Sequence, residues 1–107
     1  MKVHFTFRHM DSTEALKAHT EEKLERLKRF EETELDVHVV FEVEKFHKTV
    51  EFTVATKGHT FVVSETRDDM YEAIDLGVDK LNRQFRRDKS RRKHHKGNQG
   101  AVPEYIG

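Results

Sequence analysis

The chain has 107 residues, of which 35% are hydrophobic and 37% are charged, and it contains no cysteine and no tryptophan. This length predicts one domain with a thin core, too small to enclose a deep catalytic cavity. The lack of cysteine excludes disulfides, thiol catalysis and zinc–thiolate sites, and it favours a reducing compartment, so we expect a cytoplasmic protein. No stretch resembles a signal peptide or approaches the ~18 apolar residues of a membrane span.

The formal net charge of zero conceals a separation of charge along the chain. Residues 1–79 carry 11 basic and 18 acidic side chains, whereas residues 80–96 carry nine basic side chains and one acidic. Binding responds to the local potential, within a screening length of roughly 10 Å. The basic segment therefore predicts a polyanionic partner.

The first predicted elements are a strand and a helix. Apolar and polar residues alternate over 3–7, which is typical of a half-buried strand. Asp11 or Ser12 is then expected to cap a helix that runs to about Phe30, with Glu14 in the capping-box position. The residues expected to be buried on this helix are Leu16, Leu24, Leu27 and Phe30.

Three more strands are predicted by alternation over residues 37–43, 50–54 and 61–63. Short polar turns around 45–48 and 57–58 join them.

A second helix follows, and Thr66 with Asp69 predicts a capping box at its start. Gly77 lies inside this helix at the edge of its apolar stripe, at a cost of about 1 kcal/mol relative to alanine. We therefore expect Gly77 to allow a close approach of the first helix. The residues expected to be buried are Met70, Ile74, Val78, Leu81 and Phe85.

The order of elements is β-α-β-β-β-α, and every element is apolar on one side. The fold class this predicts is α+β with two layers, in which both helices pack on one face of a four-stranded sheet and the opposite face is largely polar. Residues 1–93 form the expected domain. Residues 94–107 are expected to form a basic and then disordered tail.

Charges on both helices are segregated by sign when they are placed at about 100° per residue. A channel of basic side chains on two adjacent helices would suit a phosphate backbone. The alternative is a solvated face with cations that favour the helix dipole. On the first helix the basic edge is His19, Lys23 and Arg26, and the acidic edge is Glu14, Glu21, Glu25 and Glu32. On the second helix the basic edge is Lys80, Arg83, Arg87 and Arg91, and the acidic edge is Asp68, Glu72, Asp75 and Asp79.

The basic segment 89–96 fits nucleic acid better than a membrane surface, because it lacks the bulky apolar residues of an interfacial helix. No histidine pair has the spacing of a metalloprotease helix. His94 and His95 lie among cations that repel metals, and His4 and His38 are interpreted as ordinary surface histidines. We expect no metal, no cofactor, no small-molecule substrate and no catalytic residue.

The second helix also carries a family resemblance. The run from Asp68 to Lys93 resembles the signature of ribosome hibernation promoting factors and the related ribosome-associated inhibitor, which have also been labelled sigma-54 modulation proteins. The resemblance covers about residues 1–93. The matching segments are Asp69-Met70-Tyr71, Ala73-Ile74-Asp75, Lys80-Leu81, Arg83-Gln84, Thr13–Leu16, Lys23–Leu27 and Val39–Lys45.

This resemblance implies a fold like that of double-stranded-RNA-binding domains. It also implies a site in the mRNA and tRNA channel of the small ribosomal subunit, where the protein contacts rRNA. Occupying the A- and P-site region would inhibit translation by steric occlusion and hold ribosomes in hibernation during stress or stationary phase. The implied phosphate contacts are Lys23, Arg26, Lys80, Arg83, Arg87 and Lys89, to which the basic edge adds Arg91. Tyr71 and Gln84 are secondary candidates, and Tyr71 could equally be a packing residue.

The chain departs from the family pattern at its C-terminal end. Long members carry a further domain that pairs ribosomes, and the ribosome-associated inhibitor has an acidic tail, whereas this tail has only Glu104. The short hibernation factor fits better, acting with a separate small ribosome-pairing partner. Whether the chain promotes or prevents pairing stays open.

Two other functions remain as alternatives. One is a general module for structured RNA that uses the same basic edge. The other is a protein-interaction regulator of transcription that uses the acidic edges. In each case we expect a monomer away from the ribosome and no membrane partner.

Overall fold

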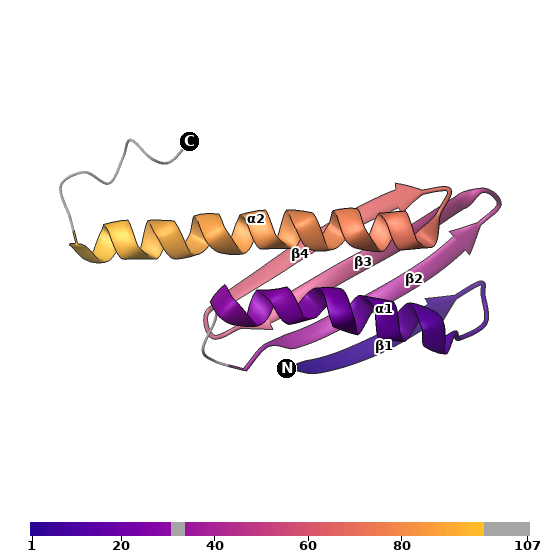
Figure 1. Ribbon diagram of the computed structural model, residues 1–107, viewed down its shortest axis with the longest axis horizontal. Coiled ribbons are helices and arrows are strands. Elements are labelled where there is room, and N and C mark those ends of the chain that lie inside the picture. The colour runs from indigo at the N-terminus through magenta and orange to yellow at the C-terminus, as the bar shows by residue number, and fades with distance from the viewer. Residues whose placement is uncertain (31–33, 98–107) are drawn as a thin grey trace.

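The computed structural model describes residues 1–30 and 34–97. The element order β-α-β-β-β-α is confirmed, with a 3₁₀ segment, η1, directly after the first helix (Figure 1). The elements are β1 (Lys2–Arg8), α1 (Glu14–Leu24), η1 (Glu25–Phe30), β2 (Asp36–Glu44), β3 (His47–Thr56), β4 (His59–Arg67) and α2 (Met70–Gly97).

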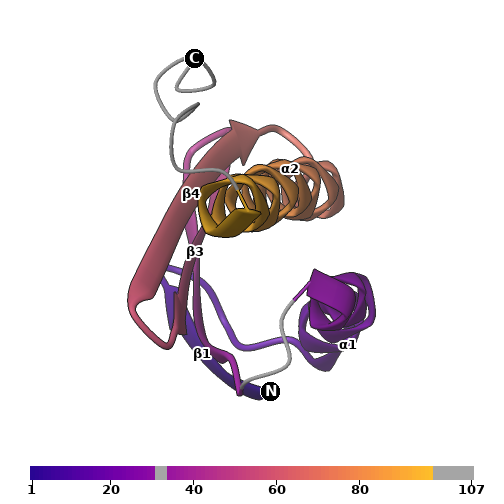
Figure 2. The same cartoon turned by 90° about the vertical axis from the view of Figure 1, so that its left-hand side faces the viewer.

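The four strands form one sheet in the order β1-β2-β3-β4. β1 and β2 are parallel, and the two following pairs are antiparallel. A parallel pair needs a crossover connection, which α1 provides, whereas tight turns join the antiparallel strands. Both helices lie on one face of the sheet, as predicted, and the other face is open (Figure 2).

The core lies between the sheet and the helices. Alternate residues of β2 and β3 are fully buried, as the period-two pattern predicted. All five residues predicted for the apolar stripe of α2 are buried, as are Leu16, Leu24 and Leu27. The burial of Phe30 lies outside the described residues.

The predicted helix caps were wrong in detail. Thr13, not Asp11 or Ser12, caps α1, and its hydroxyl accepts a hydrogen bond from the backbone N–H of Leu16 at 3.0 Å. At the start of α2, Asp69 acts alone, accepting from the backbone N–H of Tyr71 at 2.9 Å. The Thr66 hydroxyl instead bonds that of Thr49 at 2.8 Å, across β3 and β4.

Gly77 does permit a close approach, but to the sheet and not to α1 as predicted. A Cβ at this position would lie 2.6 Å from Cε2 of Phe52, a core residue of β3. The ring of Phe52 therefore occupies the space that a side chain at position 77 would need.

Helix α2 continues to Gly97, beyond the expected end of the domain at residue 93. Its C-terminal part projects past the sheet and past α1 (Figure 1). Of the predicted tail over 94–107, residues 94–97 belong to this helix, and residues 98–107 lie outside the described residues. Among the helices that the structure describes, none is long and apolar enough to cross a membrane.

Candidate nucleic-acid interface

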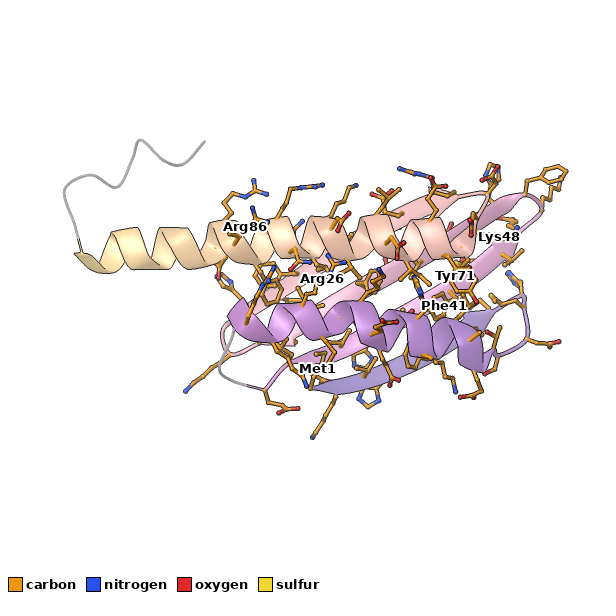
Figure 3. All side chains as sticks on the ribbon, in the orientation of Figure 1. Met1, Arg26, Phe41, Lys48, Tyr71 and Arg86 are labelled. Carbon is orange, nitrogen blue, oxygen red and sulfur yellow. The ribbon has the colours of Figure 1, made fainter. Side chains whose placement is uncertain are left out.

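The basic edge of α1 and η1 faces the acidic edge of α2. Nε2 of His19 lies 2.8 Å from Oδ1 of Asp75, and Nζ of Lys23 lies 4.0 Å from the same oxygen. Nη1 of Arg26 lies 3.6 Å from Oδ1 of Asp79, and Figure 3 shows Arg26 between the two helices. The two predicted basic edges therefore do not meet, and the expectation of one basic channel across both helices was wrong.

These ion pairs leave the cationic side chains between α1, η1 and α2 partly accessible to solvent. The side chains of Lys23 and Arg26 are 29% and 45% exposed. Ion pairs at such exposure contribute only about 0–1 kcal/mol to stability. Replacing the aspartate partner of either cation by an RNA phosphate would therefore cost little free energy. Lys23 and Arg26 can contact a polyanion, but each must first leave an aspartate.

The basic edge of α2 lies on its other side, towards β4. Lys80 forms an ion pair with Glu65, a β4 residue whose side chain is only 5% exposed. Nη1 of Arg67 lies 3.1 Å from the same carboxylate group. Two cations thus share one carboxylate, and the local charge stays positive.

Arg83 and Arg87 are exposed and four residues apart, so they lie on one side of α2. Lys89 and Arg91 continue along the same helix, but their side chains lie outside the described residues. Together, Lys80, Arg83 and Arg87 are the predicted contacts that the structure brings onto one edge.

The sequence of α2 stays basic towards its C-terminal end. The one acidic residue between 80 and 96 is Asp88, and its Oδ1 lies 2.8 Å from Nε2 of His59 on β4. Arg86 is exposed as well, and its helical phase places it on the edge that carries Asp75 and Asp79. The sequence interpretation omitted Arg86 because it considered a single edge of the helix.

Of the secondary candidates, Tyr71 has a packing contact. Its ring meets that of His19 edge-on, with centroids 5.0 Å apart, and the side chain remains 41% exposed. Gln84 is half-buried.

The sequence interpretation also missed Phe46. This side chain is 80% exposed in the turn between β2 and β3, next to Lys45, whose φ is +56°. A nearby lysine, Lys48, is the second residue of the return strand β3. An aromatic residue between two lysines in a predicted turn was the available signal, because aromatic side chains stack on unpaired bases.

One group within the described residues could hold a metal ion. It consists of His4, Asp36 and His38, on strands β1 and β2.

Comparison with known proteins defines the class of this fold. Residues 3–93 match the family described as Sigma 54 modulation protein / S30EA ribosomal protein, and the chain belongs to this family. The ribosome hibernation promoting factor of Azotobacter vinelandii is 39% identical over 85 residues, which cover 79% of each chain. That of Escherichia coli K12 is 34% identical over 95 residues, which cover 89% of this chain and all of its relative.

Solved structures agree with the family assignment. The N-terminal domain of Thermus thermophilus Protein Y has a TM-score of 0.77 and 31% identity, covering 82% of this chain and 99% of that domain. A ribosomal subunit interface protein from Coxiella burnetii has a TM-score of 0.78 and 31% identity, covering 84% and 99%. The family and the fold predicted from the sequence are both confirmed.

Proposed function

We propose that this chain binds the small ribosomal subunit in its mRNA and tRNA channel and inhibits translation by steric occlusion. Family membership and relatives named ribosome hibernation promoting factors support a role in ribosome hibernation. The observation that supports the RNA contact is the positive edge of α2 at Lys80, Arg83 and Arg87. The helix that carries this edge continues past the sheet (Figure 1). Its action belongs to the cytoplasm, where ribosomes work.

Three classes of contact follow from the geometry. Arg83 and Arg87 are exposed and can each meet a phosphate directly, with Arg able to form bidentate bonds. Lys80, Lys23 and Arg26 already have carboxylate partners, so each contributes less net free energy. Phe46 offers a ring for stacking on an unpaired base of small-subunit rRNA.

Occlusion needs only volume and a tight fit. The domain measures 51 × 25 × 18 Å, so a bound copy fills a space that neither mRNA nor a tRNA anticodon arm can then share. Phosphate contacts hold and orient the protein without reading sequence. A function of this kind requires no catalytic group.

The decisive experiment measures mRNA-dependent tRNA binding to isolated small subunits with increasing amounts of the purified chain. We expect tRNA binding to fall as the chain saturates the subunit. Unimpaired tRNA binding on subunits that carry the chain would contradict occlusion. A duplex RNA free of ribosomal sequence is the matched competitor, and we expect it to relieve the inhibition only in large excess.

A general module for structured RNA is the second candidate, because a helical edge of arginine and lysine suits any phosphate backbone. Equal affinity for the naked duplex and the small subunit would favour it. The acidic edge offers less to a protein-interaction regulator, since Asp75 and Asp79 are engaged with α1 and η1. Pairing of ribosomes through a separate small protein remains part of the proposal, tested by adding that class of partner to loaded ribosomes.

A further inference from the structure

Three potential metal ligands converge on the open face of the sheet, away from both helices (Figure 2). His4 on β1 lies beside His38 on β2, and Asp36 lies two residues before His38 on the same side of its strand. Alternate residues of a strand share a face, and neighbouring strands are about 4.8 Å apart. The parallel register of β1 and β2 therefore brings the three side chains together.

The spacing of the donor atoms suits a transition-metal ion. Nε2 of His4 lies 3.4 Å from Oδ1 of Asp36, and Nε2 of His38 lies 4.0 Å from the same oxygen. All three donor atoms lie within 4.8 Å of one another. Ligand bonds of about 2.0–2.2 Å in tetrahedral geometry place neighbouring donors ~3.3–3.5 Å apart, so a small movement of His38 completes the triangle.

The two imidazole rings are already aligned. They stack with centroids 4.7 Å apart and an interplanar angle of 20°. Nε2 of each ring lies within 4.0 Å of one carboxylate oxygen, so two nitrogen donors and one oxygen donor are gathered in one place. The side chains are between 51% and 58% exposed, which leaves room for water as the remaining ligand.

We propose that His4, Asp36 and His38 form a zinc-binding site that links β1 to β2. Two imidazoles with one carboxylate favour Zn²⁺ over Mg²⁺ and Ca²⁺, which prefer oxygen ligands. Lys2 lies opposite Asp36 in the register, so its ammonium group could compete with a cation for the carboxylate. Its long flexible stem allows the ammonium to turn into solvent when a cation binds.

This proposal departs from the expectation that the chain holds no metal. The sequence interpretation looked for histidines at helical spacing, whereas the strand pairing brings together residues more than 30 positions apart. Bound zinc would stabilise the folded chain, because the unfolded chain does not hold the three ligands together. The site does not depend on the proposed ribosome function, since it uses the opposite face of the sheet.

The test is calorimetric titration of the tag-free full chain with ZnCl₂, in a His94→Gln, His95→Gln background that removes the adjacent histidine pair. We expect one zinc ion per chain, and no heat from MgCl₂. His4→Gln, Asp36→Asn and His38→Gln should each weaken zinc binding by at least about tenfold. Changing a residue that only supports a metal ligand already costs about 10- to 100-fold in affinity, and these three residues are proposed as the ligands themselves.

The matched control is His9→Gln. His9 is another exposed histidine, and its Nδ1 lies 3.3 Å from Oε2 of Glu42. Among the described residues, His9 belongs to no group of three potential metal ligands. We expect its zinc affinity to equal that of the parent. Circular dichroism establishes that every variant is folded, as the exposure of these side chains leads us to expect.

Two further readouts separate this site from adventitious binding. Zinc should raise the melting temperature of the parent by several degrees, and at the same zinc concentration it should raise that of His38→Gln clearly less. In NMR spectra, the ring nitrogen signals of His4 and His38 should shift first on zinc addition. Unchanged affinity in both histidine variants, or first shifts at other histidines, would overturn the proposal.

Discussion

Replacing Arg83 and Arg87 by glutamine tests the RNA-facing edge of α2 most directly. Both side chains are exposed and lie outside the apolar stripe, so the fold should be preserved. Lys80 is left unchanged, because its loss would leave the buried carboxylate of Glu65 with one cation fewer. If each arginine meets one phosphate, the slope of log K against log salt should fall by about 1.4–1.8, at ~0.7–0.9 per contact.

This slope has a visible consequence for affinity. Between about 50 and 200 mM salt, the difference in slope corresponds to a change of roughly tenfold in the ratio of the two affinities. The variant should bind small subunits much more weakly than the parent at low salt, and the deficit should shrink as salt rises. Co-sedimentation with isolated small subunits across this salt range measures both quantities.

The control variant also removes two positive charges, but from the face of the sheet that lies away from α2. Lys2→Gln with Arg8→Gln alters two exposed cations of β1 and leaves α2 intact. We expect this pair to change neither the affinity nor the slope appreciably. Equal losses from both double variants would show that net charge alone drives binding, and an unchanged slope in the α2 variant would refute the assignment of this edge.

Three other substitutions probe separate parts of the molecule. Gly77→Ala places a Cβ 2.6 Å from the buried ring of Phe52, so an overpacking cost of about 1–3 kcal/mol should exceed the helix-propensity gain of about 1 kcal/mol. The urea midpoint should fall, and a rise would mean that the ring moves freely. Phe46→Ala should weaken subunit binding by about 1–3 kcal/mol with an unchanged salt slope, since stacking releases no counterions; a lower slope would contradict stacking. The hydrogen bond from the N-terminal ammonium of Met1 holds the pKa of Glu34 below its ordinary value of 4.5. The stabilisation of the fold by this pair is therefore present above pH 4.5 and is lost as the pH falls through the lowered pKa. Glu34→Gln should therefore flatten the acid limb of melting temperature against pH, and superimposable acid limbs would argue against this pair.

The layers of the fold could be predicted because strand and helix periods are local properties. Alternation in β2 and the apolar stripe of α2 each identify the buried side without knowledge of the rest of the chain. Cap positions could not be chosen in the same way. Asp11, Ser12 and Thr13 are all competent caps, and only the path of the backbone selects Thr13.

The charged surface was harder to predict for a different reason. A helical wheel shows that basic and acidic edges exist, but the rotation of each helix on the sheet decides which edges meet. That rotation turns Lys23 and Arg26 towards Asp75 and Asp79 instead of towards the basic edge of α2. The three residues of the proposed zinc site were missed because strand register, which local periodicity does not give, brings them together.

The ion pair between Glu65 and Lys80 also bears on how copies of this chain behave towards one another. β4 forms an edge of the sheet, where unpaired backbone groups can recruit a strand from another molecule. Val62 is 56% exposed on this strand and would favour such an association. Charged residues that point inward from an edge strand oppose such pairing. Glu65 is a residue of this kind, because its side chain is only 5% exposed and is paired with Lys80 and Arg67. We therefore expect the same carboxylate that lowers the positive charge near α2 to oppose association of copies through the β4 edge.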